Sequence, residues 1–362
     1  MVRVPNVLVV SPKLPVKNVR QQTHREARLG EIRYVLEDDM ITKRSFIGQA
    51  LAALTLWGCG TPARGPVGAR MERFTLSDGR LLEVFLGGVP DGFPLVAHHG
   101  TPGDATTFAD WHDACRRQGL RLICASRAGY AGSSRLPGRD VAHAARDTAE
   151  VLDRLGHQRF VTLGWSGGGP HALACAALLP TRCAAVATLG GVGAYGAPDL
   201  NFLAGMGPEN VDEFGAAIAG EANLRRWMDQ NGPELKTITG PQLAAALGGL
   251  VPDVDKAALT GEFAEHGAAV FRRALADSFG GWIDDDLAFT RRWGFELSAV
   301  KQPAAVWQGE LDLMVPLAHG RWLLSKLPQA IPHITPGQGH LSLATGEFRE
   351  QILQQLRQHA SS

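Results

Sequence analysis

The segment Gly164-Trp165-Ser166-Gly167-Gly168 constrains the fold of this 362-residue chain more than any other. It follows the apolar run 160–163 and precedes the helix-like stretch 172–179, so it predicts a serine on a sharp turn between a strand and a helix. Glycine two residues before and two residues after the serine lets the backbone turn tightly while the hydroxyl projects from the sheet. The backbone N–H of Gly167, at the start of the helix, would face an oxygen on which negative charge develops.

A serine hydroxyl is a weak nucleophile until a histidine takes its proton, and an acidic residue must orient that histidine. In a sheet of this kind the acid follows a later strand and the histidine comes near the end of the chain. Asp312 lies just beyond the apolar run 304–309, and His340 ends the segment Gly337-Gln338-Gly339-His340. The sequence therefore predicts Ser166 as nucleophile, Asp312 as the orienting acid and His340 as the base.

Other residues compete for two of these roles. Glu310 is close to Asp312, and His319 and His333 are the alternatives to His340. His319 opens a helix-like stretch and His333 lies inside the apparent last strand, so neither has the loop position expected of the base.

A second glycine-rich loop comes earlier in the chain. The run 93–97 predicts a buried strand that leads into His98-His99-Gly100-Thr101-Pro102-Gly103. A loop at the C-terminal edge of a strand can turn a backbone N–H inward, so the amides of Thr101 and Gly167 are predicted to form an oxyanion hole. His99, also a candidate for the pocket wall, would bond the backbone to hold this loop, while His98 would face the pocket.

Together these segments resemble the α/β-hydrolase superfamily, in its serine hydrolase branch with a His-Gly-x-Pro-Gly loop. Residues 127–133, Arg-Ala-Gly-Tyr-Ala-Gly-Ser, are also similar to that superfamily's Arg-x-Gly-x-Gly-x-Ser segment, and the likeness runs from about Met71 to the C-terminus. Epoxide hydrolases and haloalkane dehalogenases have a similar elbow with aspartate as nucleophile. The resemblance with serine at 166 therefore implies a hydrolase that cleaves a carboxylic ester or related acyl bond through an acyl-enzyme.

The order of apolar runs predicts an α/β fold. Residues 72–76 and 81–86 flank the hairpin signal Ser77-Asp78-Gly79-Arg80. Later strands alternate with helical stretches, which predicts a mostly parallel sheet with helices on both faces. The strands are expected at Leu95, Arg121, Phe160, Ala184, Ala304 and Ile331.

The interval between Leu189 and Ala304 breaks this alternation because it holds helix-like segments without a strong strand. It predicts a helical cap, residues 198–298, inserted into an α/β-hydrolase core made of residues 71–197 and 299–362. A cap of this kind would exclude water from the serine and shape the substrate pocket.

Candidates for the pocket wall are Met206 and Trp282 from the cap and His99 and Trp165 from the core, although a single apolar cap side chain more often packs inside the cap than against the pocket. The run Asp284-Asp285-Asp286 is expected to be the solvated start of a helix.

Composition limits the partners. The 36 lysines and arginines balance 36 aspartates and glutamates, so overall charge provides no basis for binding nucleic acid or acidic lipid. The glycine-rich stretch 191–196 lacks the following helix of a dinucleotide site, and the sequence contains neither a Walker loop nor a His-Glu-x-x-His motif. A small-molecule substrate with no cofactor and no metal is expected, and the oligomeric state is unknown.

Residues 1–70 contain no secure element and are expected to form a poorly structured extension or an export signal. From Met40, a basic start at 42–47, the apolar run 50–57 and Gly58-Cys59 resemble an export or lipoprotein signal, if translation begins there. The apolar run is shorter than the roughly 20 residues of a spanning helix, so no stable membrane span is expected. A cytoplasmic location is expected, with export or lipid anchoring as the alternative.

Two other functions remain open. The loop His99-Gly100-Thr101-Pro102-Gly103 also suggests a proline-iminopeptidase-like aminopeptidase, but the elbow of that family reads Gly-Gly-Ser-Trp-Gly, whereas here Trp165 precedes Ser166. Such an enzyme would need cap carboxylates to hold a free amine. The other alternative is a ligand-binding member of the superfamily that keeps the triad without turnover. The acidic candidates for an amine site are Glu209, Asp212 and Glu213.

Overall fold

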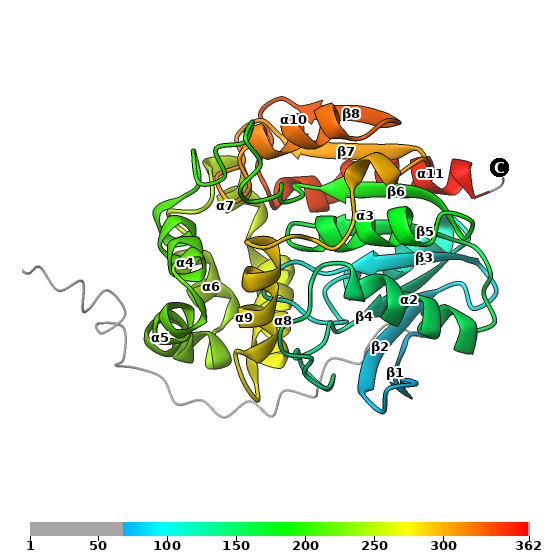
Figure 1. The fold of residues 1–362 in the computed structure, drawn as a ribbon, viewed down its shortest axis with the longest axis horizontal. Coiled ribbons are helices and arrows are strands. Elements are labelled where there is room, and N and C mark those ends of the chain that lie inside the picture. The colour runs from blue at the N-terminus through cyan, green and yellow to red at the C-terminus, as the bar shows by residue number, and fades with distance from the viewer. Residues whose placement is uncertain (1–67, 361–362) are drawn as a thin grey trace, which may run out of the picture. The chain divides into compact units, whose positions relative to one another are not determined.

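A single eight-stranded sheet organises the computed structural model, which describes residues 68–360 (Figure 1). The strand order is β1-β2-β4-β3-β5-β6-β7-β8. β1 pairs antiparallel with β2, and β2 pairs antiparallel with β4, whereas β3 to β8 are parallel to one another. The strands are β1 (Arg70–Thr75), β2 (Leu81–Gly88), β3 (Phe93–His98), β4 (Leu120–Ala125), β5 (Phe160–Trp165), β6 (Cys183–Leu189), β7 (Ala304–Gly309) and β8 (Ala330–Thr335).

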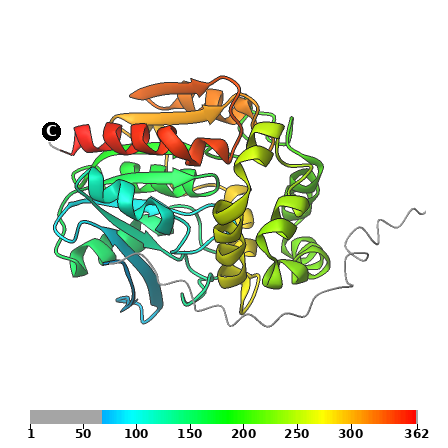
Figure 2. The ribbon, with the colours of Figure 1, turned by 180° about the vertical axis from the view of Figure 1, so that it is seen from behind.

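Helices cover both faces of this sheet, as the alternation of apolar runs predicts. α2, α3 and α10 lie on the face toward the viewer in Figure 1, and α1 and α11 lie on the face seen in Figure 2. The mostly parallel α/β-hydrolase architecture and the N-terminal hairpin are therefore confirmed. The helices are α1 (His112–Arg117), α2 (His143–Arg154), α3 (Gly168–Leu178), α10 (Leu317–Lys326) and α11 (Gly346–His359).

Each face of the sheet has its own apolar core because successive side chains of a strand point to opposite faces. Along β6, Val186 packs with the residues of α2 and α3, whereas Ala185 and Ala187 pack with those of α1 and α11. The apolar runs of the central strands are continuous because both of their faces are covered. This double burial fixes the strand ends from which the functional loops leave.

Six helices lie between β6 and β7, in the interval where the sequence predicts an inserted helical segment, and Figures 1 and 2 show them gathered at one end of the sheet. We refer to α4–α9 as the insertion. Its helices are α4 (Pro208–Ile218), α5 (Glu221–Asn231), α6 (Gly240–Ala246), α7 (Asp253–Ala258), α8 (Gly261–Leu275) and α9 (Gly280–Phe289).

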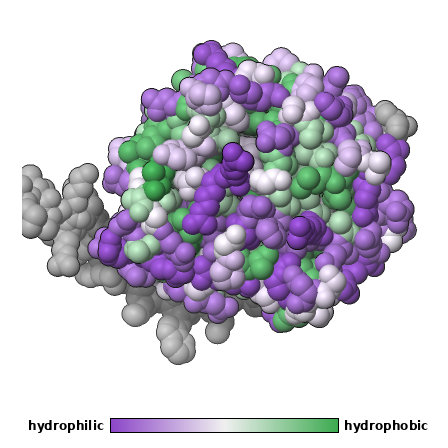
Figure 3. Space-filling view, in the orientation of Figure 1, coloured by the Kyte–Doolittle hydropathy of each residue, from purple (hydrophilic) through white to green (hydrophobic). Residues whose placement is uncertain are grey.

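The surface mixes polar and apolar side chains. In Figure 3 hydrophilic residues cover much of the face shown, and smaller apolar areas lie between them. No helix within residues 68–360 has the length and apolar character to cross a membrane. The expected export signal between Met40 and Cys59 lies outside the described residues.

Candidate active site

Ser166 lies on the turn between β5 and α3, as the elbow motif predicts. Its φ angle is +56°, in the left-handed region that side-chain-bearing residues rarely adopt. The turn is held on both sides, because the Ser166 N–H donates to the Leu189 carbonyl at 2.8 Å and the Ser166 carbonyl accepts from the Gly169 N–H at 2.9 Å. A strained conformation of this kind costs about 1–3 kcal/mol and persists where the surroundings fix it, typically at functional sites.

The flanking glycines are required by space. A Cβ on Gly164 would overlap the carbonyl oxygen of Gly168, and a Cβ on Gly168 would overlap the carbonyl oxygen of His98. The backbone on both sides of Ser166 therefore packs too closely for any side chain, which explains the spacing of glycines in the motif.

Asp312 and His340 meet beyond the ends of β7 and β8. The His340 Nδ1 lies 2.7 Å from Asp312 Oδ2. Both residues are almost completely buried, since only 2% of the surface of His340 and 3% of that of Asp312 are exposed. The other carboxylate oxygen, Oδ1, accepts the backbone N–H groups of Met314 and Val315 at 2.9 and 2.8 Å. Asp312 is thus fixed by the loop that carries it and holds Nδ1 of the imidazole, which leaves Nε2 outside this contact.

The electrostatic surroundings favour a protonated His340. Burial by itself lowers the pKa of His340, but the Asp312 carboxylate, its hydrogen bond and the charge of Asp255 outweigh burial and raise this pKa above its ordinary value. The structure therefore stabilises the imidazolium that forms when a histidine takes a proton from a nucleophile.

The rival residues have other contacts. His319 accepts the Gly193 N–H on Nδ1 at 2.9 Å, and its Nε2 donates to the Phe202 carbonyl at 2.9 Å. His333 stacks on Trp307 with ring centroids 3.9 Å apart. Neither histidine pairs with Asp312, so the structure supports His340 over both.

Asp255 on α7 holds the loop that carries His340, and no local sequence pattern predicts this contact. This aspartate is fully buried and accepts the backbone N–H of His340 at 2.6 Å and that of Ser342 at 2.9 Å. A Cβ on Gly339 would overlap the Asp255 carboxylate. The insertion therefore contacts the backbone of His340 directly, through a hydrogen bond between residues 85 positions apart.

The predicted oxyanion loop packs against the elbow. A Cβ on Gly100 would lie 3.4 Å from the Ser166 Cβ, and a Cβ on Gly167 would overlap the Thr101 hydroxyl. The backbone N–H groups of Thr101 and Gly167 have no acceptor among the described residues. Both amides are thus available beside the serine.

A buried ionic network supports this loop from behind. Arg127 Nη2 donates to the Gly100 carbonyl at 2.9 Å and to Asp285 Oδ2 at 2.6 Å, and the Thr101 hydroxyl donates to the same carboxylate at 2.8 Å. Arg139 lies 2.6 Å from the other oxygen of Asp285. Burial raises the pKa of Asp285, but the charges of Arg127 and Arg139 outweigh it and hold the pKa well below its usual range.

The expectation that Asp284-Asp285-Asp286 is a solvated helix start is wrong. α9 begins at Gly280, and all three aspartates are buried in its middle. Composition alone suggested solvation, whereas the partners of these carboxylates come from residues more than 60 positions away and left no local sequence signal.

One cavity of about 360 Å³ joins these parts, a volume that suits a small-molecule ligand. Its wall includes Ser166, His340 and Thr101, together with the predicted pocket residues Trp165 and Trp282. The Trp165 ring also stacks on the His340 ring, with centroids 5.9 Å apart. Helices of the insertion supply much of the remaining wall.

Two predicted pocket residues lie elsewhere. His99 is fully buried behind the oxyanion loop, where Nδ1 bonds the Gly100 carbonyl at 2.7 Å and Nε2 accepts the Arg127 N–H at 3.0 Å. Met206 packs in the core with Phe202 and Phe214. A pocket role is wrong for both, because loop support and core packing occupy these side chains.

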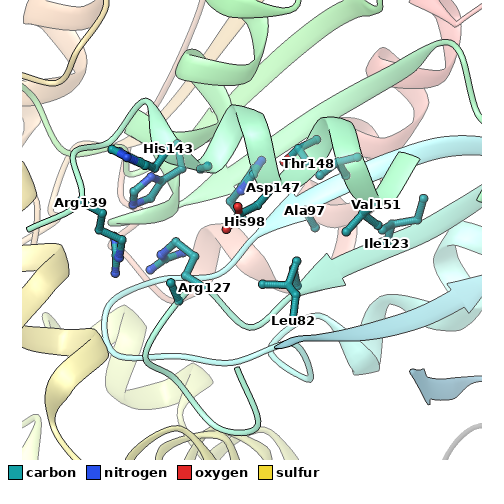
Figure 4. Close-up of a pocket in the computed structure, with 15 residues that line it drawn as sticks. Leu82, Ala97, His98, Ile123, Arg127, Arg139, His143, Asp147, Thr148 and Val151 are labelled. Atoms are coloured by element: carbon teal, nitrogen blue, oxygen red, sulfur yellow. The ribbon is translucent and has the colours of Figure 1, made fainter. Parts of the chain in front are cut away.

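A second, much smaller cavity of about 40 Å³ lies between the sheet and α2 (Figure 4). His98 and Arg139 point toward it, and Asp147 and Thr148 line it from α2. His98 therefore faces away from the Ser166 cavity.

The link between serine and histidine is looser than the other contacts. Ser166 and His340 line the same cavity, but their side chains form no hydrogen bond among the contacts of the described residues. Catalytic hydrogen bonds of this type often shorten only in the complex with substrate.

Comparison with known proteins identifies the family. The family model described as alpha/beta hydrolase fold matches residues 94–347, so this chain belongs to that family of hydrolases. The uncharacterized hydrolase YcgS of Bacillus subtilis (strain 168) is 32% identical over 114 residues, which span 31% of this chain and 38% of YcgS. A 2-hydroxy-6-oxononadienedioate/2-hydroxy-6-oxononatrienedioate hydrolase of Burkholderia vietnamiensis (strain G4 / LMG 22486) is 26% identical over 253 residues, 68% of this chain and 80% of the relative.

The fold has counterparts among solved structures. An alpha/beta hydrolase fold protein from Nakamurella multipartita superposes with a TM-score of 0.59 and 22% identity, covering 81% of this chain and all of that one. At this identity the likeness concerns the fold.

Proposed function

We propose that this protein is a serine hydrolase that cleaves a carboxylic ester or related acyl bond of a small molecule through an acyl-enzyme. The observation that carries the proposal is the meeting, in one cavity, of a serine in a strained left-handed turn with a buried histidine that an aspartate holds at 2.7 Å. The names of the related hydrolases agree with this chemistry at the level of bond hydrolysis.

In this mechanism His340 Nε2 removes the proton of the Ser166 hydroxyl while Oγ attacks the substrate carbonyl carbon. The amides of Thr101 and Gly167 stabilise the resulting oxyanion, and each such donor contributes roughly a hundredfold in rate. When the tetrahedral intermediate collapses, the alcohol leaves with the proton from His340. Water then attacks the acyl-enzyme with His340 as base, which releases the acid and restores the Ser166 hydroxyl.

Labelling with a fluorophosphonate probe tests the nucleophile. The wild-type protein should gain one adduct on the peptide that contains Ser166, and Ser166→Ala should gain none. Ser133→Ala, which alters a buried serine on another loop, is the control and should label as the wild type does. Folded wild-type protein that stays unlabelled, and that hydrolyses no nitrophenyl ester, would favour a binding role instead.

A further inference from the structure

A carboxyl group at the wall of the cavity, that of Glu213, has a second and fully buried carboxyl group beside it, that of Asp286. Glu213 on α4 lines the cavity and is 8% exposed, and Asp286 on α9 is fully buried. The Trp282 indole N–H donates to Glu213 Oε1 at 2.6 Å. The mechanism proposed above uses neither carboxyl group.

This pair lacks donors. Neither oxygen of Asp286 accepts a hydrogen bond from any described residue, unless one of the two acids keeps a proton and donates it to the other. Native proteins pair nearly all of their buried polar atoms, so an unpaired buried carboxyl group calls for an explanation. The four carboxyl oxygens of Glu213 and Asp286 thus have one protein N–H donor between them, and they are suited to accept hydrogen bonds from a ligand.

The pair also holds protons more tightly than ordinary acids. Burial raises the pKa of Glu213 to about 7, although the hydrogen bonds from Trp282 and Asp286 act in the opposite direction. Burial, Glu213 and Asp285 raise the pKa of Asp286 well above its ordinary value, against the charge of Arg139. Near neutral pH the pair is therefore close to losing a proton, and a cation bound beside it would remove that proton.

The rest of the cavity wall favours a cation. Among the described residues that line it there is no lysine or arginine, whereas three carboxyl groups are present. Asp110 is paired with Arg349 at 3.6 Å, which leaves Glu209 and Glu213 without a basic partner. Trp227 and Trp282 lie beside Glu213 in the wall, with ring centroids 6.0 Å apart. Aromatic rings next to a carboxylate attract ammonium groups through the ring faces and the charge together.

We propose that Glu213, backed by Asp286, binds an ammonium group of the substrate, so that this enzyme prefers acyl substrates that carry a cationic nitrogen. The inference rests on the proposed function for the identity of the reacting bond. The ammonium group of the substrate would then lie against the insertion while the substrate carbonyl lies at Ser166, since Glu213 and Ser166 line the same cavity. Of the three acidic residues that the sequence offers for an amine site, Asp212 is exposed and absent from the cavity wall.

Matched substrates test the proposal. One pair of nitrophenyl esters has acyl chains of equal length that end in trimethylammonium or in tert-butyl, and a second pair ends in a primary ammonium or in methyl. The wild-type enzyme should show a higher kcat/KM for the cationic member of at least one pair. Glu213→Gln should lower that preference by about tenfold to a hundredfold, since hydrogen bonds and contacts to a charged group have this size.

Asp212→Asn is the matched control, because it removes a charge from the same helix on the side away from the cavity. It should leave the preference unchanged within about twofold, as expected of an exposed charge in water. The glutamine variant keeps an acceptor for the Trp282 N–H, so loss of folding is not expected; thermal melting checks this.

The pH profile gives a second readout. Trimethylammonium does not titrate, and the ratio of kcat/KM between the two esters cancels the titration of His340. The ratio should rise as pH increases through about 7, the pKa of Glu213, and should stay flat in Glu213→Gln. The groups that act on Glu213 are Trp282 and Asp286, and Asp285 and Arg139 act on Asp286 in turn.

The outcomes separate the two proposals. Equal kcat/KM within both ester pairs, on an enzyme that is labelled at Ser166, overturns the ammonium site and leaves the hydrolase intact. A preference that survives Glu213→Gln overturns it as well. If no ester is hydrolysed and Ser166 is not labelled, the proposed function fails, and calorimetric binding of butyltrimethylammonium to wild type, but not to Glu213→Gln, would still support the site.

Discussion

Asp285 and Asp286 are neighbours on α9, yet their carboxyl groups lie in opposite electrostatic surroundings. Asp285 faces the oxyanion loop, where Arg127 and Arg139 neutralise it and the Tyr130 hydroxyl adds a hydrogen bond at 2.9 Å. Asp286 faces Glu213 and receives no hydrogen bond from a base. Consecutive side chains of a helix point about 100° apart, so one turn of α9 places Asp285 in one region and Asp286 in the other.

The difference separates two uses of buried charge. A carboxylate surrounded by its own cations and donors is part of the scaffold, because removing it leaves other charges unpaired. A buried carboxyl group without such partners gains its partner only from a ligand or a proton. The ion pairs of Asp285 therefore hold the loop that contains Thr101 in a fixed position. The protonation of Glu213 and Asp286, by contrast, should change when a charged ligand binds in the cavity.

The largest effect is expected at Ser166, the proposed nucleophile. Ser166→Ala should lower turnover by about a millionfold if the triad acts as a unit. Its stability should be at least that of the wild type, since alanine removes only the hydroxyl. The measurement is single-turnover ester hydrolysis beside denaturant unfolding, and residual activity within a hundredfold of the wild type would exclude Ser166 as the nucleophile.

Asp285→Asn tests the region in which the buried carboxylate is neutralised by arginines. It leaves Arg127 and Arg139 with one neutral amide in place of a shared carboxylate, so the free energy of unfolding should fall by about 3–5 kcal/mol. Asp284→Asn is the control, because Asp284 pairs with Arg135, whose side chain is 30% exposed, and its loss should be smaller. If the two variants lose the same free energy of unfolding, the ionic network behind Thr101 contributes no more to stability than the ion pair of Asp284 does.

Asp255→Asn tests the contact between the insertion and the base. Asparagine offers one acceptor where aspartate offers two, so either the His340 or the Ser342 N–H loses its partner. We expect kcat to fall by about tenfold to a hundredfold, in line with one lost hydrogen bond to a charged group. Labelling of Ser166 should slow in parallel; unchanged labelling kinetics would mean that the loop holds itself.

Asp286→Asn removes the buried carboxyl group that has no basic partner among the described residues. It should have the smallest effect of these variants, and it should raise the free energy of unfolding rather than lower it. The raised pKa of Asp286 means that the folded protein binds a proton which the unfolded chain releases, so wild-type stability falls as pH rises from about 4 upward. The asparagine does not titrate, so the free energy of unfolding of the variant should match that of the wild type at low pH and exceed it above neutrality. Unfolding curves at pH 5 and pH 8 measure this difference, and a variant less stable at both would contradict it.

The sequence predicted the parts of the site whose signals are local or follow chain order. Ser166 is marked by its glycines, which the backbone needs within five residues. Asp312 and His340 follow from the order of strands, and the structure brings them together at the sheet edge.

The contacts made across the insertion could not be predicted in this way. Asp255, Asp285 and Asp286 meet partners far away in the chain, and an acidic residue alone gives no sign of whether it will be solvated or buried. Residue type and neighbourhood predict His99 and Met206 in the pocket, whereas the burial of these side chains depends on the packing of several segments at once.

The hydrogen bonds from His340 and Ser342 to Asp255 also bear on how such proteins diversify. Exchanging the helical segment between β6 and β7 for that of a relative is an obvious route to new selectivity. In this chain the exchange would also remove the acceptor that positions His340, the proposed general base, so a chimera would need an acidic residue restored at the same place. If the proposed mechanism holds, a segment from a relative would therefore support activity in this chain only when it supplies a carboxylate where Asp255 lies.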